Sequence, residues 1–285
     1  MRRTRLAQQK QLWLLIFVAV FFTVAPRAAF ADVDKIAIEG TTVTVNAEES
    51  FDLTNVTEIL WDHFPGDDHS LRLSAPASPV CTFVTPIVTE NKVFHLRLWV
   101  TYKDGTKNND MWNITVQDNG ITGFPSNFLT FYTYNGHAMG IRVDPFGNED
   151  GLVYLKAVDP ATITETKNRP ATLPYGLIET RVRMDKPGRA TVLNFYLERP
   201  AYSWLKWSKY MNGSWIFGPD YANIDPNRLN CTIVVKDGGD GDDDGVADGM
   251  IYDPCGLGSP PGIQSSRSDD GGTGCFIRAL RGLGW

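Results

Sequence analysis

The chain has 285 residues, of which 42% are hydrophobic and 21% are charged. This composition is typical of globular proteins and excludes a collagen-like or wholly disordered chain. The chain carries 27 Lys and Arg against 33 Asp and Glu, a net charge of −6, which argues against a nucleic-acid-binding protein because phosphate binding requires clustered cations.

Residues 1–31 are predicted to form a signal peptide for secretion. A cationic start precedes an apolar run at 12–24, and Ala29 and Ala31 place small residues where a signal peptidase cleaves. The apolar run is shorter than the roughly 20 residues that a membrane span requires. We therefore expect a mature chain that begins at Asp32, has no transmembrane span and resides on a cell surface or in the extracellular space.

The rest of the chain shows the two-residue period of β-strands. Within 93–101, Phe94, Leu96 and Leu98 fall on one face, and His95 and Arg97 fall on the other. Similar short runs lie at 36–38, 43–45, 112–116, 152–158, 178–184, 193–197 and 231–235. Clusters of Gly, Pro, Asn and Asp separate them, and no long window has a helical period. The pattern predicts an all-β chain built from β-sandwich, Ig-like domains.

Polar turn residues at 117–120 interrupt the series of strands. We therefore predict one β-sandwich domain over 32–117 and a second β domain over 120–258, each long enough for its own core. Beyond residue 258, Ser, Pro, Gly and Asp dominate. This composition predicts a flexible tail over 259–285.

Several segments of the first predicted domain resemble the PKD/REJ-type Ig-like sandwich of bacterial surface proteins. They are VTVNA at 43–47, ILW at 59–61, TFVTP at 82–86, FHLRLWVT at 94–101, the KDG turn at 103–105 and WNITV at 112–116. The resemblance implies that Trp61 is a buried core residue. It also implies a role in spacing or adhesion rather than catalysis.

The second predicted domain resembles the choice-of-anchor U domain of exported bacterial proteins. The segments are PYGLI at 174–178, PGRATV at 187–192, KWSKY at 206–210 and DGGDGDDDGVADGMIYDP at 237–254. This resemblance implies a neighbouring C-terminal sorting signal. GGTGCFI at 271–277 is similar to the start of a Cys-Phe-Ile sorting box, which makes Cys275 an anchoring candidate, but the chain departs from the box from Arg278 onward.

The four cysteines are Cys81, Cys231, Cys255 and Cys275. Four cysteines permit three pairings, and the sequence does not choose among them. Cys231 with Cys255 is the candidate disulfide, because it would close a loop around the acidic run and stabilise the fold by roughly 3 kcal/mol. Free thiols are the alternative.

The acidic run has the spacing of a calcium-binding loop. Alternating carboxylates can surround one hard cation, and the glycine after the third permits a sharp turn. The predicted ligands of a structural calcium ion are Asp240, Asp242, Asp244, the carbonyl of Val246, Asp248 and Asp253. The alternative is a hydrated acidic turn that keeps the domain soluble.

The sequence contains no nucleophile elbow, phosphate-binding glycine loop or histidine pair with metal spacing. His63 and His69 flank an acidic turn, where a metal role is not expected. Two carboxyl groups for glycoside hydrolysis could converge from anywhere in the chain, but no pair stands out. We expect no catalytic activity.

Tyrosine and tryptophan cluster within 202–221. Exposed aromatic rings can stack on sugars, and the candidates are Trp204, Trp207, Tyr210 and Trp215; core packing is the favoured alternative. We therefore predict a non-catalytic exported spacer or adhesion protein whose partner is a cell-envelope or extracellular-matrix component such as a polysaccharide. A carbohydrate-binding accessory protein and a glycoside hydrolase are the alternatives.

Overall fold

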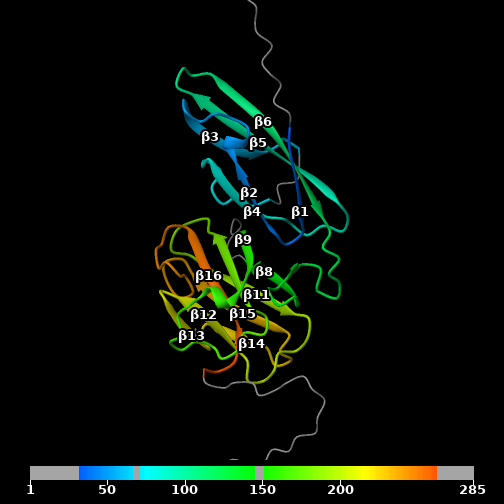
Figure 1. Ribbon diagram of the computed structural model, residues 1–285, viewed down its shortest axis with the longest axis vertical. Helices are drawn as coiled ribbons and strands as arrows, with labels where there is room; N and C mark the ends of the chain where they lie inside the picture. The colour runs from blue at the N-terminus through cyan, green and yellow to red at the C-terminus, as the bar shows by residue number, and fades with distance from the viewer. Residues whose placement is uncertain (1–31, 67–70, 145–150, 262–285) are drawn as a thin grey trace, which may run out of the picture. The chain divides into compact units, whose positions relative to one another are not determined.

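A computed structural model describes residues 32–66, 71–144 and 151–261. The chain is all-β, as the period of two predicts (Figure 1). In the described part of the chain, the only helical elements are two 3-10 turns, η1 (Ala47–Glu49) and η2 (Pro160–Thr162). None of the described helices is long and apolar enough to cross a membrane.

The N-terminal strands form a four-stranded sheet and a two-stranded sheet. The larger sheet has the order β1-β6-β5-β3, and the smaller pairs β2 with β4. The bounds are β1 (Val33–Ile38), β2 (Thr42–Asn46), β3 (Val56–His63), β4 (Val80–Val84), β5 (Lys92–Tyr102) and β6 (Lys107–Gln117). β1 runs parallel to β6, whereas the other pairs are antiparallel.

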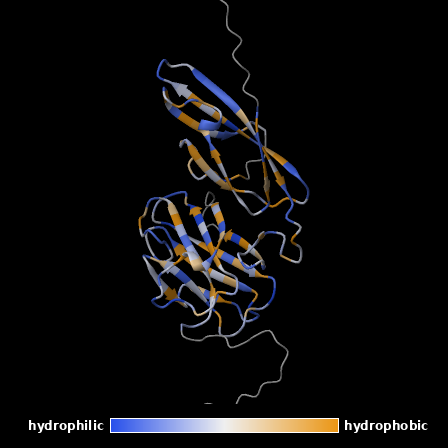
Figure 2. Cartoon of the chain, in the orientation of Figure 1, coloured by the Kyte–Doolittle hydropathy of each residue, from blue (hydrophilic) through white to orange (hydrophobic). Residues whose placement is uncertain are grey.

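The long hairpin β5–β6 shows how the sequence specifies this part of the fold. Phe94, Leu96 and Leu98 of β5 are buried, while the intervening residues are partly exposed. Gly105 in the turn has φ +79°, a backbone conformation that glycine adopts without steric cost. Figure 2 shows hydrophobic and hydrophilic residues alternating along strands. The predicted inward face is confirmed.

The first hydrophobic core contains two buried tryptophans in edge-to-face contact. The ring centroids of Trp61 and Trp112 are 5.1 Å apart at 83°, a favourable geometry for aromatic rings. The Trp61 indole N–H donates to the Ser78 carbonyl at 3.0 Å, and the Trp112 N–H donates to the Ser50 hydroxyl at 3.1 Å. The buried position expected for Trp61 is therefore confirmed.

The later strands form two five-stranded sheets with the orders β13-β12-β16-β10-β9 and β14-β15-β11-β8-β7. The bounds are β7 (Leu129–Tyr132), β8 (Ala138–Asp144), β9 (Gly151–Val158), β10 (Leu177–Arg183), β11 (Ala190–Leu197), β12 (Lys206–Met211), β13 (Ser214–Phe217), β14 (Ala222–Ile224), β15 (Asn230–Lys236) and β16 (Met250–Gly258). Every strand pair in both sheets is antiparallel.

A second hydrophobic core joins side chains from these two sheets. Phe195 of β11 packs against Trp207 of β12, with ring centroids 4.7 Å apart. Leu257 of β16 and Ile233 of β15 belong to the same buried cluster. This arrangement of two sheets over one core is a β-sandwich.

Some predictions made from the sequence lie outside the described residues. They are the signal peptide at 1–31, residues 262–285 of the tail with Cys275, and His69. The predicted division into domains over 32–117 and 120–258 stays a prediction, although β6 ends at Gln117, where the boundary is expected.

Candidate functional site

Two of the four candidate sugar-stacking residues are buried in the core, as the favoured packing interpretation expects. Trp207 and Trp215 are each 2% exposed. Trp207 packs on Phe195, and the Trp215 indole N–H donates to the Glu165 carbonyl at 3.0 Å. Tyr210 is partly exposed and packs its ring against Trp215 at 5.3 Å. These three residues therefore serve packing, because large rings fill the space beneath a pleated sheet.

The fourth candidate, Trp204, does lie on the surface, and it has an aromatic neighbour. Trp204 is 46% exposed and Tyr202 is 55% exposed. Their rings are stacked, with centroids 4.6 Å apart and an angle of 7° between the planes. We call these two residues the aromatic pair. Both lie in the loop between β11 and β12, and together they present a flat apolar surface to solvent.

Arg228 holds the loop that carries the aromatic pair. Its Nε donates to the Ala201 carbonyl at 2.8 Å, and its Nη2 donates to the carbonyls of Tyr202 at 2.8 Å and Leu205 at 2.7 Å. In return, the Ala201 amide donates to the Arg228 carbonyl at 2.9 Å. A guanidinium offers several donors in a fixed plane, so one side chain fixes the backbone on both sides of Trp204.

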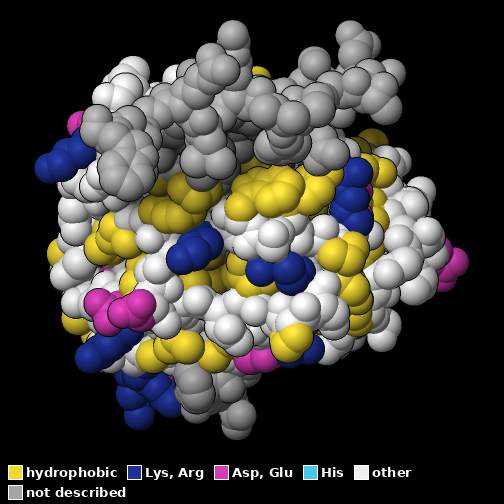
Figure 3. Space-filling view, turned by 90° about the horizontal axis from the view of Figure 1, so that it is seen from below, with side chains coloured by type: hydrophobic (Ala, Val, Ile, Leu, Met, Phe, Trp, Pro, Cys, Tyr) yellow, Lys and Arg dark blue, Asp and Glu magenta, His cyan; other side chains and the backbone are white. Residues whose placement is uncertain are grey.

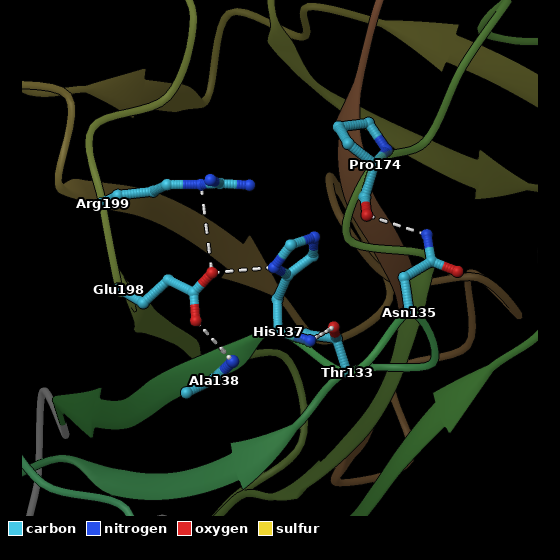
Figure 4. A network of polar contacts seen from close by, with 7 residues as sticks. All are labelled: Thr133, Asn135, His137, Ala138, Pro174, Glu198 and Arg199. Atoms are coloured by element: carbon cyan, nitrogen blue, oxygen red, sulfur yellow. Dashed lines mark hydrogen bonds and ion pairs between the residues drawn. The ribbon is translucent and has the colours of Figure 1, made fainter. Parts of the chain in front are cut away.

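A cluster of polar residues lies where β11 ends and β8 begins (Figure 4). The cluster consists of His137, Glu198 and Arg199, and we call it the polar cluster. Glu198 Oε1 is 2.7 Å from His137 Nδ1 and 3.9 Å from Arg199 Nε. The Ala138 amide donates to Glu198 Oε2 at 3.0 Å. Because Leu197, the last residue of β11, pairs with Met139 in the β8–β11 register, Glu198 directly after the strand falls beside Ala138.

The charges of the polar cluster favour an ionised Glu198. Burial by itself raises the pKa of Glu198, but hydrogen bonds from Ala138 and His137 and the charges of His137 and Arg199 outweigh it, so the pKa is lowered. The cluster also contacts Tyr175, whose ring centroid is 5.0 Å from that of His137. Burial foremost raises the pKa of Tyr175, against a hydrogen bond with Arg199.

The polar cluster and the aromatic pair share one loop. Glu198 and Arg199 follow the end of β11 directly, and Tyr202 and Trp204 lie further along the same loop before β12. The site therefore combines a stacked aromatic surface with a carboxylate, a guanidinium and an imidazole. Such a set can stack on a ring and exchange hydrogen bonds with hydroxyl groups. Figure 3 shows a face of the molecule on which hydrophobic side chains lie among Lys and Arg side chains.

The acidic loop between β15 and β16 uses two of its carboxylates to bind its own backbone. Asp242 is 1% exposed and accepts the amides of Gly238 at 2.8 Å and Tyr252 at 3.0 Å. Asp237 accepts the amides of Asp248 at 3.3 Å and Gly249 at 3.0 Å. These bonds fold the loop, because they satisfy buried amides that no strand partner reaches.

Glycine is required at one turn of this loop. Gly241 has φ +87°, and a Cβ there would lie 2.6 Å from Cγ1 of Val235. The sequence is therefore limited to glycine at this position by both backbone conformation and space.

The six predicted calcium ligands do not converge. Asp240, Asp244, Val246 and Asp248 are exposed, whereas Asp242 and Asp253 are buried in separate contacts. Among the described residues, no group of three or more His, Cys, Asp or Glu side chains is placed to hold a metal ion. The proposed ligand set is thus not assembled here, because the buried carboxylates already bind the backbone and a lysine. Calcium binding itself stays a prediction.

Replacing Asp242 with alanine is expected to lower the free energy of unfolding by about 2–4 kcal/mol, because two buried amides lose their acceptor. Chemical denaturation would measure the change, with Asp244→Ala as the control; Asp244 is exposed and accepts one amide, that of Val246. Equal losses in the two variants would contradict this role.

Thermal melts in calcium and in chelator test whether the acidic loop binds calcium. A rise in Tm that depends on calcium and is lost in Asp242→Ala would support a calcium site.

Burial also affects the titration of Asp242. It raises the pKa above the ordinary 3.8, although the amides of Tyr252 and Gly238 oppose the shift. The folded chain therefore holds this proton more tightly than the unfolded chain. By linkage, the contribution of Asp242 to stability declines as pH rises from about 4 through the raised pKa.

The candidate disulfide is absent from the structure. Cys231 of β15 and Cys255 of β16 are both free and buried, as is Cys81. The two candidate partners belong to different five-stranded sheets of the second sandwich. Burial raises the pKa of both thiols, so each is held as a neutral, poorly reactive group.

Three features of the second sandwich are not evident from sequence motifs. Lys209 is a buried lysine that contacts Asp253, and both side chains are 1% exposed. Tyr202 forms half of the aromatic pair, and His137 meets Glu198 across a strand pair. The burial of Lys209 could have been predicted from the alternation of the strand, because Lys209 lies two residues from Trp207 and therefore on the same face. His63 Nε2 lies 2.9 Å from the carbonyl oxygen of Leu71.

The comparisons with known proteins found only distant similarities. No protein-family model matches the chain, and no curated protein matches it. Among solved structures, it is similar to the PKD domain from the KIAA 1837 protein, with 18% identity and a TM-score of 0.27, covering 34% of this chain and 90% of that chain. It is also similar to Sidekick-1 immunoglobulin domains 1–4, with 7% identity and a TM-score of 0.26, covering 71% and 66%.

A third solved structure is a carbohydrate-binding module from the β-sandwich superfamily. It shares 12% identity with a TM-score of 0.23 and covers 79% of this chain and 93% of that chain. Likenesses this distant carry no inference about activity or ligand. The function must be argued from the site itself.

Proposed function

We propose that this protein is an exported, non-catalytic β-sandwich protein that binds polysaccharide through the aromatic pair, Tyr202 and Trp204. The single observation that supports this most is the stacked, solvent-exposed geometry of the two rings, 4.6 Å apart. Large aromatic side chains are normally buried in a core, and an exposed group of them marks a binding surface. The flat faces of sugar rings present C–H groups that such a surface can cover.

Rigidity favours binding by the aromatic pair. The three hydrogen bonds from Arg228 fix the loop before any ligand arrives. A preorganised surface loses less conformational entropy on binding than a mobile one. The loop is therefore suited to hold Tyr202 and Trp204 in one orientation.

The polar cluster supplies the hydrogen bonds that a sugar requires. Glu198 is an acceptor with a lowered pKa, so it is ionised at neutral pH, and Arg199 is a donor. Hydroxyl groups of a sugar both donate and accept. This pairing of an apolar surface with a few polar groups is typical of small-ligand sites.

The same geometry favours binding over catalysis. Hydrolysis of a glycosidic bond generally uses two carboxyl groups about 5 to 10 Å apart. Glu198 is instead joined to a histidine and an arginine. The pKa of Glu198 is lowered, and a carboxyl group that stays ionised at neutral pH is poorly suited to donate a proton. A hydrolase thus remains the weaker alternative.

Export, spacing and anchoring complete the proposal. We infer secretion from the signal-like residues 1–31, and a role as a spacer or adhesion module from the resemblance to PKD-type sandwiches. The partner would be a cell-envelope or extracellular-matrix polysaccharide, and Cys275 would take part in anchoring or sorting. Locating the chain after cell fractionation, with and without Cys275, tests this part separately from sugar binding.

Retention of the purified chain on insoluble polysaccharides such as cellulose, chitin and xylan tests sugar binding. We expect retention on at least one of them, weakened about fivefold by Trp204→Ala, which corresponds to about 1 kcal/mol for one aromatic contact. Phe64→Ala is the matched control, because Phe64 is 41% exposed but follows β3, away from the aromatic pair and the polar cluster. Equal retention of wild type and Trp204→Ala on every polysaccharide would contradict the proposal.

A further inference from the structure

A lysine and an aspartate are in contact inside the second β-sandwich. Lys209 lies on β12 and Asp253 on β16, which are neighbouring antiparallel strands. Lys209 pairs in register with Cys255, so Asp253, two residues away, points to the same face of the sheet. The Lys209 Nζ donates to Asp253 Oδ1 and to the Gly241 carbonyl.

The surroundings of this pair are apolar. Both side chains are 1% exposed, and the second hydrophobic core includes Trp207, Ile251 and Leu257 from the same two strands. Lysine and aspartate are almost never fully buried unless they are paired. In this medium the separated charges lose their hydration, which brings the neutral amine and carboxylic acid closer in free energy to the ion pair.

Two further polar groups lack a protein partner at this place. Asp253 Oδ2 and the Tyr221 hydroxyl are buried without a hydrogen bond among the described residues. Both groups belong to one electrostatic environment, because the charge of Asp253 acts on Tyr221 and on the neighbouring Cys255 thiol. An ion pair buried to contribute stability would ordinarily have every lone pair satisfied. A salt bridge from Lys209 to Oδ1 therefore does not account for the burial of Asp253 Oδ2.

We propose that Lys209 and Asp253 react to form an intramolecular amide bond that links β12 to β16. A proton first passes from the Lys209 ammonium to the Asp253 carboxylate, giving a neutral amine and a carboxylic acid. The Nζ lone pair then attacks Cγ of Asp253, and the C–OH bond breaks. The departing hydroxyl takes a proton from nitrogen and leaves as water. No oxidant, reductant or other reactant is consumed.

The fold supplies what the reaction needs. The amine is held against the carboxyl group, and well-oriented groups in one molecule reach effective concentrations of about 10⁵ M or more. Burial removes the hydration that keeps free amines and acids ionised in water. The proton that moves from nitrogen to the departing oxygen passes directly between the two groups of the pair, because Nζ already donates to the carboxylate. The Gly241 carbonyl holds Nζ in position.

The bond would fasten two strands that the chain separates widely. The residues are 44 positions apart, and the segment between them includes β13, β14, β15 and the acidic loop. A covalent link there restricts the unfolded chain, as a disulfide does. Unlike a disulfide, it resists reduction, so it would suit a protein exposed outside the cell.

Intact mass spectrometry of the purified full chain tests the proposal. The chain is denatured and its thiols are reduced and alkylated, and its N-terminus is determined. We expect a mass lower than the sequence mass by one water molecule. A tryptic digest should yield one branched peptide that joins Lys209 to Asp253, with no cleavage after Lys209.

Variants assign the bond to this pair. Asp253→Ala and Lys209→Arg should show their full sequence masses, whereas Lys206→Arg, on the exposed end of the same strand, should keep the loss of water. The mass of the wild-type chain tests the proposal even if Asp253→Ala and Lys209→Arg fail to fold. A wild-type chain at its full sequence mass, or a loss of water mapped to other residues, would overturn the proposal.

Discussion

Replacing Lys209 with methionine is expected to lower the free energy of unfolding by at least about 3–5 kcal/mol. Methionine has nearly the same length and leaves no large cavity, so the effect comes from the loss of the link to Asp253, ionic or covalent, and not from lost volume. Asp253, 1% exposed, then remains buried without its cation. Denaturant unfolding followed by tryptophan fluorescence measures the change.

Two comparisons identify the cause of that loss. Lys206→Met removes an exposed lysine from the same strand and is expected to change stability by no more than about 0.5 kcal/mol. The loss in Lys209→Met should also be smaller at pH 4 than at pH 7, because protonation neutralises a buried carboxylate that lacks a cation. A loss below about 1 kcal/mol, or no dependence on pH, would mean that Asp253 does not depend on Lys209.

Replacing Trp61 with alanine is expected to lower the free energy of unfolding by about 3–5 kcal/mol. The substitution removes a buried ring, its edge contact with Trp112 at 5.1 Å and its hydrogen bond to Ser78. The surrounding sheets cannot close the cavity without moving their strands. Chemical denaturation measures the loss.

Leu60→Ala is the control for this prediction. Leu60 is the neighbouring residue of β3 but faces outward and is exposed. Its truncation removes little buried area, so we expect a change of about 0.5 kcal/mol or less. Similar losses in Trp61→Ala and Leu60→Ala would contradict the central position of Trp61 in the first core.

The fold could be predicted largely because burial imposes a period of two on a strand with one covered face. The inward residues of β5, Phe94, Leu96 and Leu98, follow this rule. β16 alternates in the same way over residues 250–255, but the sequence did not predict it, because Pro254 lies inside the strand, paired with Glu179 of β10. Proline has no amide to donate and normally indicates an edge or a break, so the local sequence argues against this strand.

Composition indicated an aromatic region but not which rings reach solvent. Trp204 and Trp207 are separated by three positions, yet the first lies in a loop and the second in a strand covered on its inner face. Exposure depends on where β12 begins, and element boundaries follow from tertiary packing as much as from local sequence. The aromatic pair therefore became evident only in the folded chain.

The contact between His137 and Glu198 could not be predicted from the sequence, for a different reason. His137 and Glu198 are 61 positions apart, and they meet because β8 and β11 pair in one particular register. Register is set by the whole buried face, so no local motif indicates the contact.

In the acidic loop a local motif is present, but the structure uses it differently. Its spacing resembles a metal site, whereas Asp242 binds the amides of Gly238 and Tyr252.

Affinity electrophoresis in gels that contain a soluble polysaccharide is the most direct measurement of the central claim, sugar binding by Tyr202 and Trp204. Wild type and the control Phe64→Ala should be slowed to the same extent. The double variant Tyr202→Ala/Trp204→Ala should migrate as it does in a gel without polysaccharide. Equal slowing of the double variant and wild type, or no slowing of wild type by any polysaccharide, would contradict the claim.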